Sequence, residues 1–169
     1  MKIKKIICWP PLLGGIGAGV TIAILSYITF QSILAGTNYG LWLTASFGSS
    51  AVVVFGYPQN EFSQPKNVLF GHLLCAFVGI IFVTLFKISQ DRTIFFLVLG
   101  IAVGISVMLM MVFKITHPPA GANTIVVILA QESYQFLAFP IMAGAITIII
   151  GGVIYNRLIL KKNYPLKWL

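Results

Sequence analysis

The sequence predicts an all-α protein, a polytopic membrane helix bundle with six hydrophobic segments of which two are short or broken. Of the 169 residues, 59% are hydrophobic and only 8% are charged, whereas soluble domains are about a quarter charged. The mean hydropathy is +0.99. Several apolar runs approach the roughly 20 residues with which a helix crosses a bilayer. We therefore expect residues 1–169 to form a single transmembrane domain in contact with the lipid bilayer.

The charge pattern supports a membrane location and argues against nucleic-acid binding. The net charge of +8 comes from 11 basic and three acidic residues, and the basic residues lie at the ends of the apolar runs. This pattern follows the positive-inside rule, because cytoplasmic loops are enriched in Lys and Arg. We expect a plasma membrane protein, in bacteria an inner membrane protein, with both termini cytoplasmic.

The chain start and the cysteines indicate no processing or metal binding. The first residues, Met1 to Lys5, could begin a signal peptide, but no small-residue cleavage site follows, so the first helix is expected to remain. Cys8 and Cys75 have neither a CxxC nor a metal-ligand spacing. No disulfide, metal or cofactor is expected.

The first three hydrophobic segments follow the order long, short, long. The first runs from about Pro11 to Leu34 and is rich in glycine, which lets helices approach closely in lipid. The second, Gly40 to Phe55, has only about 16 residues and contains several Ser and Thr side chains. A polar connector, Gly56 to Asn67, leads to the third segment, Val68 to Phe86.

The last three segments repeat that order. The fourth runs from Ile94 to Phe113 after the polar turn Lys87 to Thr93. The fifth, Pro118 to Ala130, would form a helix of roughly 20 Å, too short to cross a hydrocarbon core of about 30 Å. The sixth runs from Phe136 to about Leu160.

The repeated order predicts an internal repeat with halves 1–88 and 89–169. An offset of 73 residues places three glycines and an apolar run on their counterparts: Gly48 on Gly121, Gly71 on Gly144, Gly79 on Gly152, and 52–55 on 125–128. If the short segments cross, six spans form two inverted halves, and if they re-enter, four spans form two parallel halves. The positive-inside rule leaves both open, because nine of the 11 basic residues fall inside in either case.

The stretch Thr116 to Thr124, reading THPPAGANT, is the main candidate site. Pro118 suits a first helical position, with Thr116 or His117 as the cap. The free N–H groups, the helix dipole, Lys114 and a protonated His117 would then converge on one spot that favours a small anion. The candidate binding residues are Lys114, Thr116, His117, Pro118, Pro119, Gly121, Ala122, Asn123 and Thr124. Alternatively, the prolines only end the fourth segment, His117 caps it and Lys114 anchors it at the interface.

A second group of polar residues lies in the first half of the chain. It comprises Ser49, Ser50, Gln64, Lys66, Asn67 and His72. Each also has an ordinary structural interpretation. Lys66 can be an interfacial anchor, His72 can bond a neighbouring helix, and the serines, together with Ser46, can bond backbone carbonyls of their own helix.

The positions of the acidic residues argue against cation coupling through a buried carboxylate. Glu61, Asp91 and Glu132 all fall in predicted loops, whereas proton and cation conductors commonly place carboxylates within the membrane. A catalytic carboxylate pair, a metal-ligand cluster and a Ser-His-Asp set are also missing, so we expect no enzyme. His72 and His117 are the residues that can change charge near neutral pH.

The motif at Thr116 to Ala122, THPPAGA, resembles the HPP family of integral membrane proteins. Gln64 to Asn67 and Gly71 to His72 resemble the second stretch typical of that family, QPxN followed by GH. The resemblance implies four transmembrane helices and, from plant and cyanobacterial members, an association with nitrite transport. Some members carry C-terminal CBS domains, and none is expected here because the chain ends after its last span.

These observations together predict a transporter or channel for a small monovalent anion, with nitrite as the first candidate. The two short segments are then expected to approach each other at the substrate path, and the protein is expected to form a homo-oligomer. The alternative is a non-transporting membrane subunit that acts in assembly or sensing. An intramembrane enzyme with His117 as a base is a third interpretation.

Overall fold

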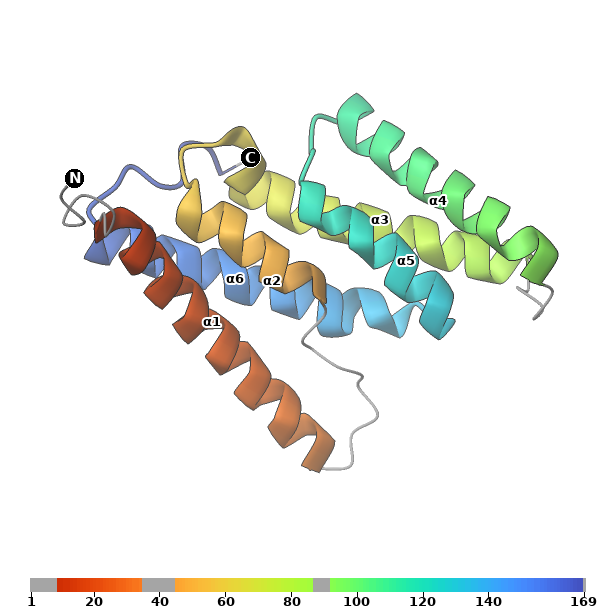
Figure 1. Ribbon diagram of the computed structural model, residues 1–169, viewed down its shortest axis with the longest axis horizontal. Helices are drawn as coiled ribbons and strands as arrows, with labels where there is room; N and C mark the ends of the chain where they lie inside the picture. Colours follow the sequence, from red (N-terminus) through yellow and green to blue (C-terminus); the bar gives the residue numbers. More distant parts are fainter. Residues whose placement is uncertain (1–8, 35–44, 87–91, 169) are drawn as a thin grey trace, which may run out of the picture.

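The computed structural model describes residues 9–34, 45–86 and 92–168, and every regular element in this part of the chain is helical (Figure 1). The first half contains α1 (Trp9–Leu34), α2 (Ala45–Ala51) continued by η2 (Val52–Gly56), η3 (Glu61–Ser63) and α3 (Pro65–Phe86). The second half contains α4 (Arg92–Val112), η4 (Pro118–Ala120), α5 (Gly121–Ala130), η5 (Leu137–Met142), α6 (Ala143–Val153) and η6 (Ile154–Ile159).

The predicted all-α membrane bundle with four long and two short segments is confirmed. Four helices are long and apolar enough to cross a membrane, at 11–31, 65–86, 94–112 and 137–159. The shorter apolar helices are 45–56 and 118–130. Two predicted regions, 40–44 and the turn 87–91, lie outside the described residues.

The predicted boundaries need two changes. The third helix begins at Pro65 and not at Val68, because proline suits the first helical turn and the Val68 N–H already donates to the Gln64 carbonyl oxygen over 3.0 Å. The fifth segment begins at Pro118 as predicted, but its first three residues form the tighter 3-10 turn η4.

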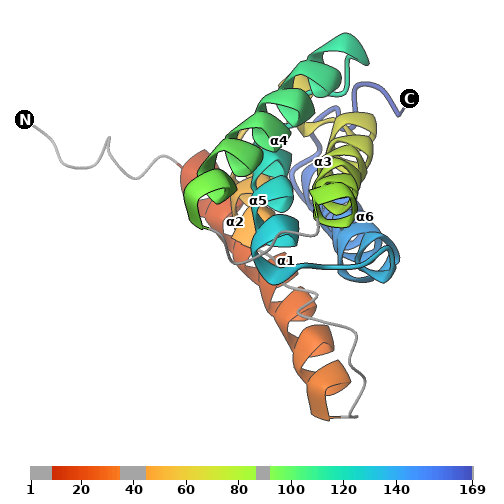
Figure 2. The same cartoon turned by 90° about the vertical axis from the view of Figure 1, so that its right-hand side faces the viewer.

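The C-terminal part of the chain contacts α1 and the connector before α3 at one end of the bundle. There, Tyr155 near the end of the last helix donates to the Leu13 carbonyl oxygen of α1, and the Tyr164 hydroxyl donates to the Ser63 carbonyl oxygen over 2.8 Å. The helices alternate in direction along the chain, and the short helices α2 and α5 lie between the longer ones (Figures 1 and 2). Both ends of the described chain therefore lie at the same end of the bundle.

Each short helix packs against glycines of the long helix that follows the other short helix. An added Cβ at Gly79 of α3 would lie 2.9 Å from the Cβ of Val127 in α5, and one at Gly152 of α6 would collide with Val54. Likewise, α3 packs closely on Ile115 and His117, which precede the second short helix, at Gly71, and α6 packs on Phe47 of α2 at Gly144. These close approaches need glycine, because any side chain would push the helices apart.

Candidate functional site

The HPP loop, residues 113–117, is turned into the bundle by the end of α4. The Ile115 N–H donates to the Met110 carbonyl oxygen over 2.9 Å and the Lys114 N–H to that of Met111 over 3.1 Å, while Lys114 adopts a left-handed φ of 54°. This bond pattern is a Schellman motif, which reverses the chain direction at a helix end. It buries Ile115 and leaves the Lys114 side chain exposed.

His117 lies fully buried at the start of the second short helix. It has an extended backbone with φ of −136° and ψ of 97°, as expected for a residue that precedes proline. Its Nδ1 lies 2.7 Å from the Phe62 carbonyl oxygen, and its Nε2 lies 2.8 Å from the Ser50 hydroxyl. The imidazole therefore bridges the connector after the first short helix and the first short helix itself.

His72 on α3 lies next to His117 and shares the same serine. Its Nε2 lies 2.8 Å from Ser50 Oγ, and its Nδ1 lies 2.7 Å from Asn123 Nδ2. The centroids of the two imidazole rings are 5.0 Å apart. Ser46 completes the arrangement, because its hydroxyl donates to Asn123 Oδ1 over 2.6 Å.

These side chains form what we call the histidine network: Ser46, Ser50, His72, His117 and Asn123. All five are at most 1% exposed. They come from α2, α3, the HPP loop and α5, so the two short helices meet as the sequence predicts. A buried polar cluster of this kind is stable only when each donor and acceptor has a partner.

Chemistry assigns the proton positions in the network. A carbonyl oxygen only accepts, so the Phe62 carbonyl places a proton on His117 Nδ1. Asn123 Nδ2 also lies 3.3 Å from the His72 carbonyl oxygen, which fixes that atom as the amide nitrogen. His72 Nδ1 is therefore an acceptor, and a neutral His72 carries its proton on Nε2, facing Ser50.

A polar pocket of about 330 Å³ lies next to the network, because Phe62, whose carbonyl oxygen bonds His117, lines it. Asn67 at its wall donates to the Thr116 carbonyl oxygen over 2.9 Å. One acidic side chain, Glu61, and one basic side chain, Lys114, line the pocket, together with Thr116, which precedes His117. Its lining residues are Glu61, Phe62, Asn67, Met111, Lys114 and Thr116.

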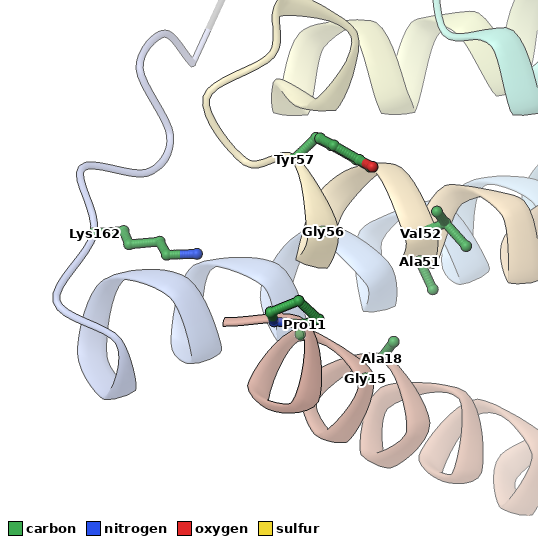
Figure 3. Close-up of a pocket in the computed structure, with 9 residues that line it drawn as sticks. Pro11, Gly15, Ala18, Ala51, Val52, Gly56, Tyr57 and Lys162 are labelled. Atoms are coloured by element: carbon green, nitrogen blue, oxygen red, sulfur yellow. The ribbon is translucent and has the colours of Figure 1, made fainter. Parts of the chain in front are cut away.

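Another cavity, of about 390 Å³, lies between α1 and the first short helix. Figure 3 shows it lined mostly by apolar and glycine residues, with Lys162 extending from the tail toward it. An inorganic anion would find few hydrogen-bond donors on these walls. The polar pocket and the histidine network therefore form the better candidate site.

The structure corrects the predicted role of the helix N-terminus. Pro118 and Pro119 have no N–H, the Ala120 N–H donates to the His117 carbonyl oxygen over 2.9 Å, and the Gly121 N–H donates within the turn. The first four positions therefore offer no free backbone donor to an anion. Side chains, and not the helix end, supply the polar groups, and His117 occupies the cap position without a side-chain capping bond.

Gln64 is also removed from the candidate list. Its Nε2 donates to the carbonyl oxygens of Pro58 and Asn60 over 3.0 and 2.8 Å. Its Oε1 accepts the Leu166 N–H over 2.7 Å. The side chain fastens the C-terminal tail to the connector, so it has no group left for a ligand.

The remaining predicted residues lie outside the histidine network and the polar pocket. Ser49 is exposed on the face of α2 opposite to its buried neighbour Ser50. Lys66, Pro118, Pro119, Gly121 and Ala122 line neither the network nor the polar pocket. Thr124 is buried, but its hydroxyl lies 2.9 Å from the Cys75 carbonyl oxygen and 2.7 Å from Ser106 Oγ, where it joins three helices.

Two parts of the site are missed by the candidate list. Ser46 was predicted only to bond its own helix, whereas it bonds Asn123 across 77 positions of sequence. The Phe62 carbonyl oxygen carries no sequence signal, because every residue has one. Within the described residues, no group of three His, Cys, Asp or Glu side chains could hold a metal ion.

Comparison with known proteins gives one family and two relatives. The family described as HPP, transmembrane region, matches residues 5–165. Two transmembrane proteins of Dictyostelium discoideum are 34% and 30% identical over 131 and 133 residues, which are 75% and 76% of this chain. The chain spans less than half of these relatives, 45% and 42% of their lengths. No solved structure matches the chain.

Proposed function

The chain belongs to the HPP family of transmembrane proteins, and we propose that it is a transporter or channel for a small monovalent anion. The observation that carries the proposal is the meeting of two short helices at the buried histidine network, beside a polar pocket. Helices too short to cross a bilayer are tolerated where they are buried in protein or line a polar path.

The charge of the site favours an anion over a cation. The polar groups that face the pocket and the network include the Lys114 ammonium, two imidazoles and the amide of Asn67. Glu61 is the acidic side chain in the pocket lining, and the described spans contain no Asp or Glu. Cations are usually bound by carboxylate and carbonyl oxygens, so this donor-rich set suits an oxyanion.

Nitrite is the substrate that the family resemblance suggests. It is small, monovalent and planar, and its two oxygens accept hydrogen bonds from donors of the kinds that Lys114, Asn67 and Thr116 provide. We propose a transport protein and not an enzyme, in a bacterial inner membrane with cytoplasmic termini, and a homo-oligomeric assembly. The common location of the two described chain ends supports an even number of crossings.

Nitrite uptake into vesicles tests the proposal. Purified protein in liposomes with an inward nitrite gradient should take up nitrite faster than empty vesicles. Lys114→Asn should reduce the rate about tenfold, because a charge-assisted hydrogen bond contributes about 1.5–3 kcal/mol and 1.4 kcal/mol is a factor of ten. His117→Ala should bring uptake close to that of empty vesicles.

Lys161→Asn is the matched control for Lys114→Asn. Both lysines are exposed and both have a left-handed φ, 54° and 53°, which asparagine tolerates better than most residues. Lys161 lies outside the polar pocket. Equal nitrite uptake by vesicles with and without the protein would contradict the proposal. Equal effects of Lys114→Asn and Lys161→Asn on uptake would contradict it as well.

A non-transporting membrane subunit is the second candidate. The observation that favours it is α1, whose C-terminal end extends away from the other helices (Figures 1 and 2). Such a helix offers an apolar face on which another membrane protein can pack. Constant purification with a different chain, together with no nitrite uptake, would support this candidate over transport.

A further inference from the structure

The Ser50 hydroxyl has a complete set of three hydrogen-bond partners. Its Oγ lies 2.8 Å from His72 Nε2, 2.8 Å from His117 Nε2 and 3.0 Å from the Ser46 carbonyl oxygen. A hydroxyl has one proton to donate and two lone pairs that accept. The hydroxyl can therefore bond all three partners only when two of them donate to it, and the position of its single proton depends on the protonation state of the two rings.

With both rings neutral, the hydroxyl proton has one satisfactory position. His72 Nε2 donates to Ser50, because its Nδ1 accepts from Asn123. His117 Nε2 has no proton, because its proton is on Nδ1 and faces the Phe62 carbonyl. Ser50 must then donate to His117 Nε2, since the alternative would leave that buried nitrogen without a partner.

The network has room for one additional proton. If His117 Nε2 is protonated, it donates to Ser50, and the hydroxyl proton rotates to the Ser46 carbonyl oxygen at 3.0 Å. Ser50 then accepts from both rings and every group keeps a partner. A proton on His72 Nδ1 would instead face the amide hydrogens of Asn123. The geometry thus favours His117 Nε2 as the atom that takes up the additional proton, and the network can accept one such proton.

The charged groups around His117 determine how much one additional proton changes the local charge. His72 and Lys66 are the titratable groups on the nearest turns of α3, Glu61 adjoins Phe62 in the connector, and Lys114 lies in the preceding turn. The nearby faces of α2 and α5 contribute Ser50, Ser46 and Asn123. Glu61 and Lys114 carry opposite charges in the polar pocket, and Lys66 lies outside its lining, so a proton on His117 adds one positive charge beside a pocket whose own charges cancel.

We infer that His117 carries one proton together with each transported anion, and that the Ser50 hydroxyl is the switch that accommodates it. The inference rests on the proposed transport function. Water on one side supplies the proton, an N–H bond forms at His117 Nε2, and the same bond breaks when the proton returns to water on the other side. An isolated buried imidazolium is costly, so the proton and the anion enter as a neutral pair.

The driving force of nitrite uptake tests this coupling in the intact protein. Nitrite uptake and internal pH are measured in vesicles with and without the protein. Either a pH gradient or a membrane potential, fixed by a potassium gradient, is imposed. One proton per nitrite predicts about tenfold accumulation for each unit of pH difference. It also predicts no dependence on the potential, because the transported pair carries no net charge.

Failures of the two proposals look different in this experiment. Nitrite uptake that follows the potential and moves no protons overturns the coupling and leaves anion transport standing. Uptake no faster than in empty vesicles removes the transport function, and the coupling with it.

Variants of Ser50 test the switch. Ser50→Ala should lower the proton-to-nitrite ratio and abolish the dependence on the pH gradient, whereas Ser50→Thr retains the hydroxyl and should restore both. Ser106→Ala is the matched control, because it also deletes a fully buried serine hydroxyl, one that bonds Thr124 outside the histidine network. An unchanged ratio in Ser50→Ala would overturn the role of Ser50.

Nitrogen NMR provides a readout that does not need a stable variant. The chain contains two histidines, so protein without a histidine tag and labelled with ¹⁵N-histidine gives four ring signals. Adding nitrite at constant pH to the wild-type protein should protonate one nitrogen, Nε2 of His117. Unchanged ring signals in nitrite-saturated protein would contradict the inference.

Discussion

The two short helices occupy equivalent places in the chain but supply different chemistry. The first provides the Ser46 and Ser50 hydroxyls, and the second provides the Asn123 amide and follows directly after His117. The 73-residue offset that aligns Gly48 with Gly121 also aligns Ser50 with Asn123. These two side chains bind the two ring nitrogens of the same imidazole, that of His72.

The packing of the two short helices is similar, whereas their polar groups differ. Val54 and Val127, which the offset aligns, are both fully buried, and each meets a glycine of a long helix, Gly152 and Gly79 respectively. The counterpart of His72 is Ala145, which is buried and carries no polar group. The comparison teaches that two short helices with similar packing carry different polar groups, and that the aligned position of His72 holds an alanine. The internal repeat remains a prediction, which these reciprocal contacts support.

Replacing Asn123 should have the largest effect on stability. Asn123→Leu keeps the size of the side chain but leaves His72 Nδ1 and the Ser46 hydroxyl without these partners. An unsatisfied buried group costs about 1–3 kcal/mol, so the free energy of unfolding should fall by about that amount for His72 Nδ1, with about 0.5–1.5 kcal/mol more for the lost Ser46 hydrogen bond. Thermal unfolding in detergent measures it. An unchanged Tm would show that the amide is dispensable.

Glycine substitutions test whether the packing of the two halves is equivalent. An added Cβ at Gly71 would meet the Ile115 carbonyl oxygen at 3.1 Å, and one at Gly144 would collide with the Phe47 ring. Gly71→Ala and Gly144→Ala should each lower the free energy of unfolding by about 1–3 kcal/mol through overpacking. Gly104→Ala is the control, because no heavy atom lies within 4 Å of its added Cβ. An unchanged free energy of unfolding in Gly71→Ala would show that the packing at Gly71 and at Gly144 is not equivalent.

Thr124→Val should have the smallest effect of the three changes. It removes a buried hydroxyl next to Asn123 and preserves the side-chain shape, while the Cys75 carbonyl oxygen lies within helix α3. We expect a loss of about 1 kcal/mol and an unchanged proton-to-nitrite ratio, because Thr124 lies outside the histidine network. A loss as large as that of Asn123→Leu would show that the second short helix has two equally important polar contacts.

Much of the fold is predictable because it depends on local patterns. The lengths of the apolar runs predict four long and two short helices, and proline marks the start of the fifth segment at Pro118. The start of α3 was placed three residues late, because Pro65 was assigned to the connector. The HPP and GH motifs contribute His117 and His72 to the buried network, and a role of these residues in binding remains a prediction.

The sequence by itself determined that this protein is a membrane helix bundle with two short polar segments, because hydrophobic length and periodicity are local properties. Tertiary structure decided which polar groups meet. Ser50 belongs to the network and Ser49 does not, because successive helical residues point in different directions. Gln64 bonds the tail 102 residues away, and the donors at 120–121 are used within their own turn. The chemistry of the site therefore depends on contacts between distant parts of the chain. Each polar group can form only a few hydrogen bonds, and a group that is bonded within the protein is not available to a ligand.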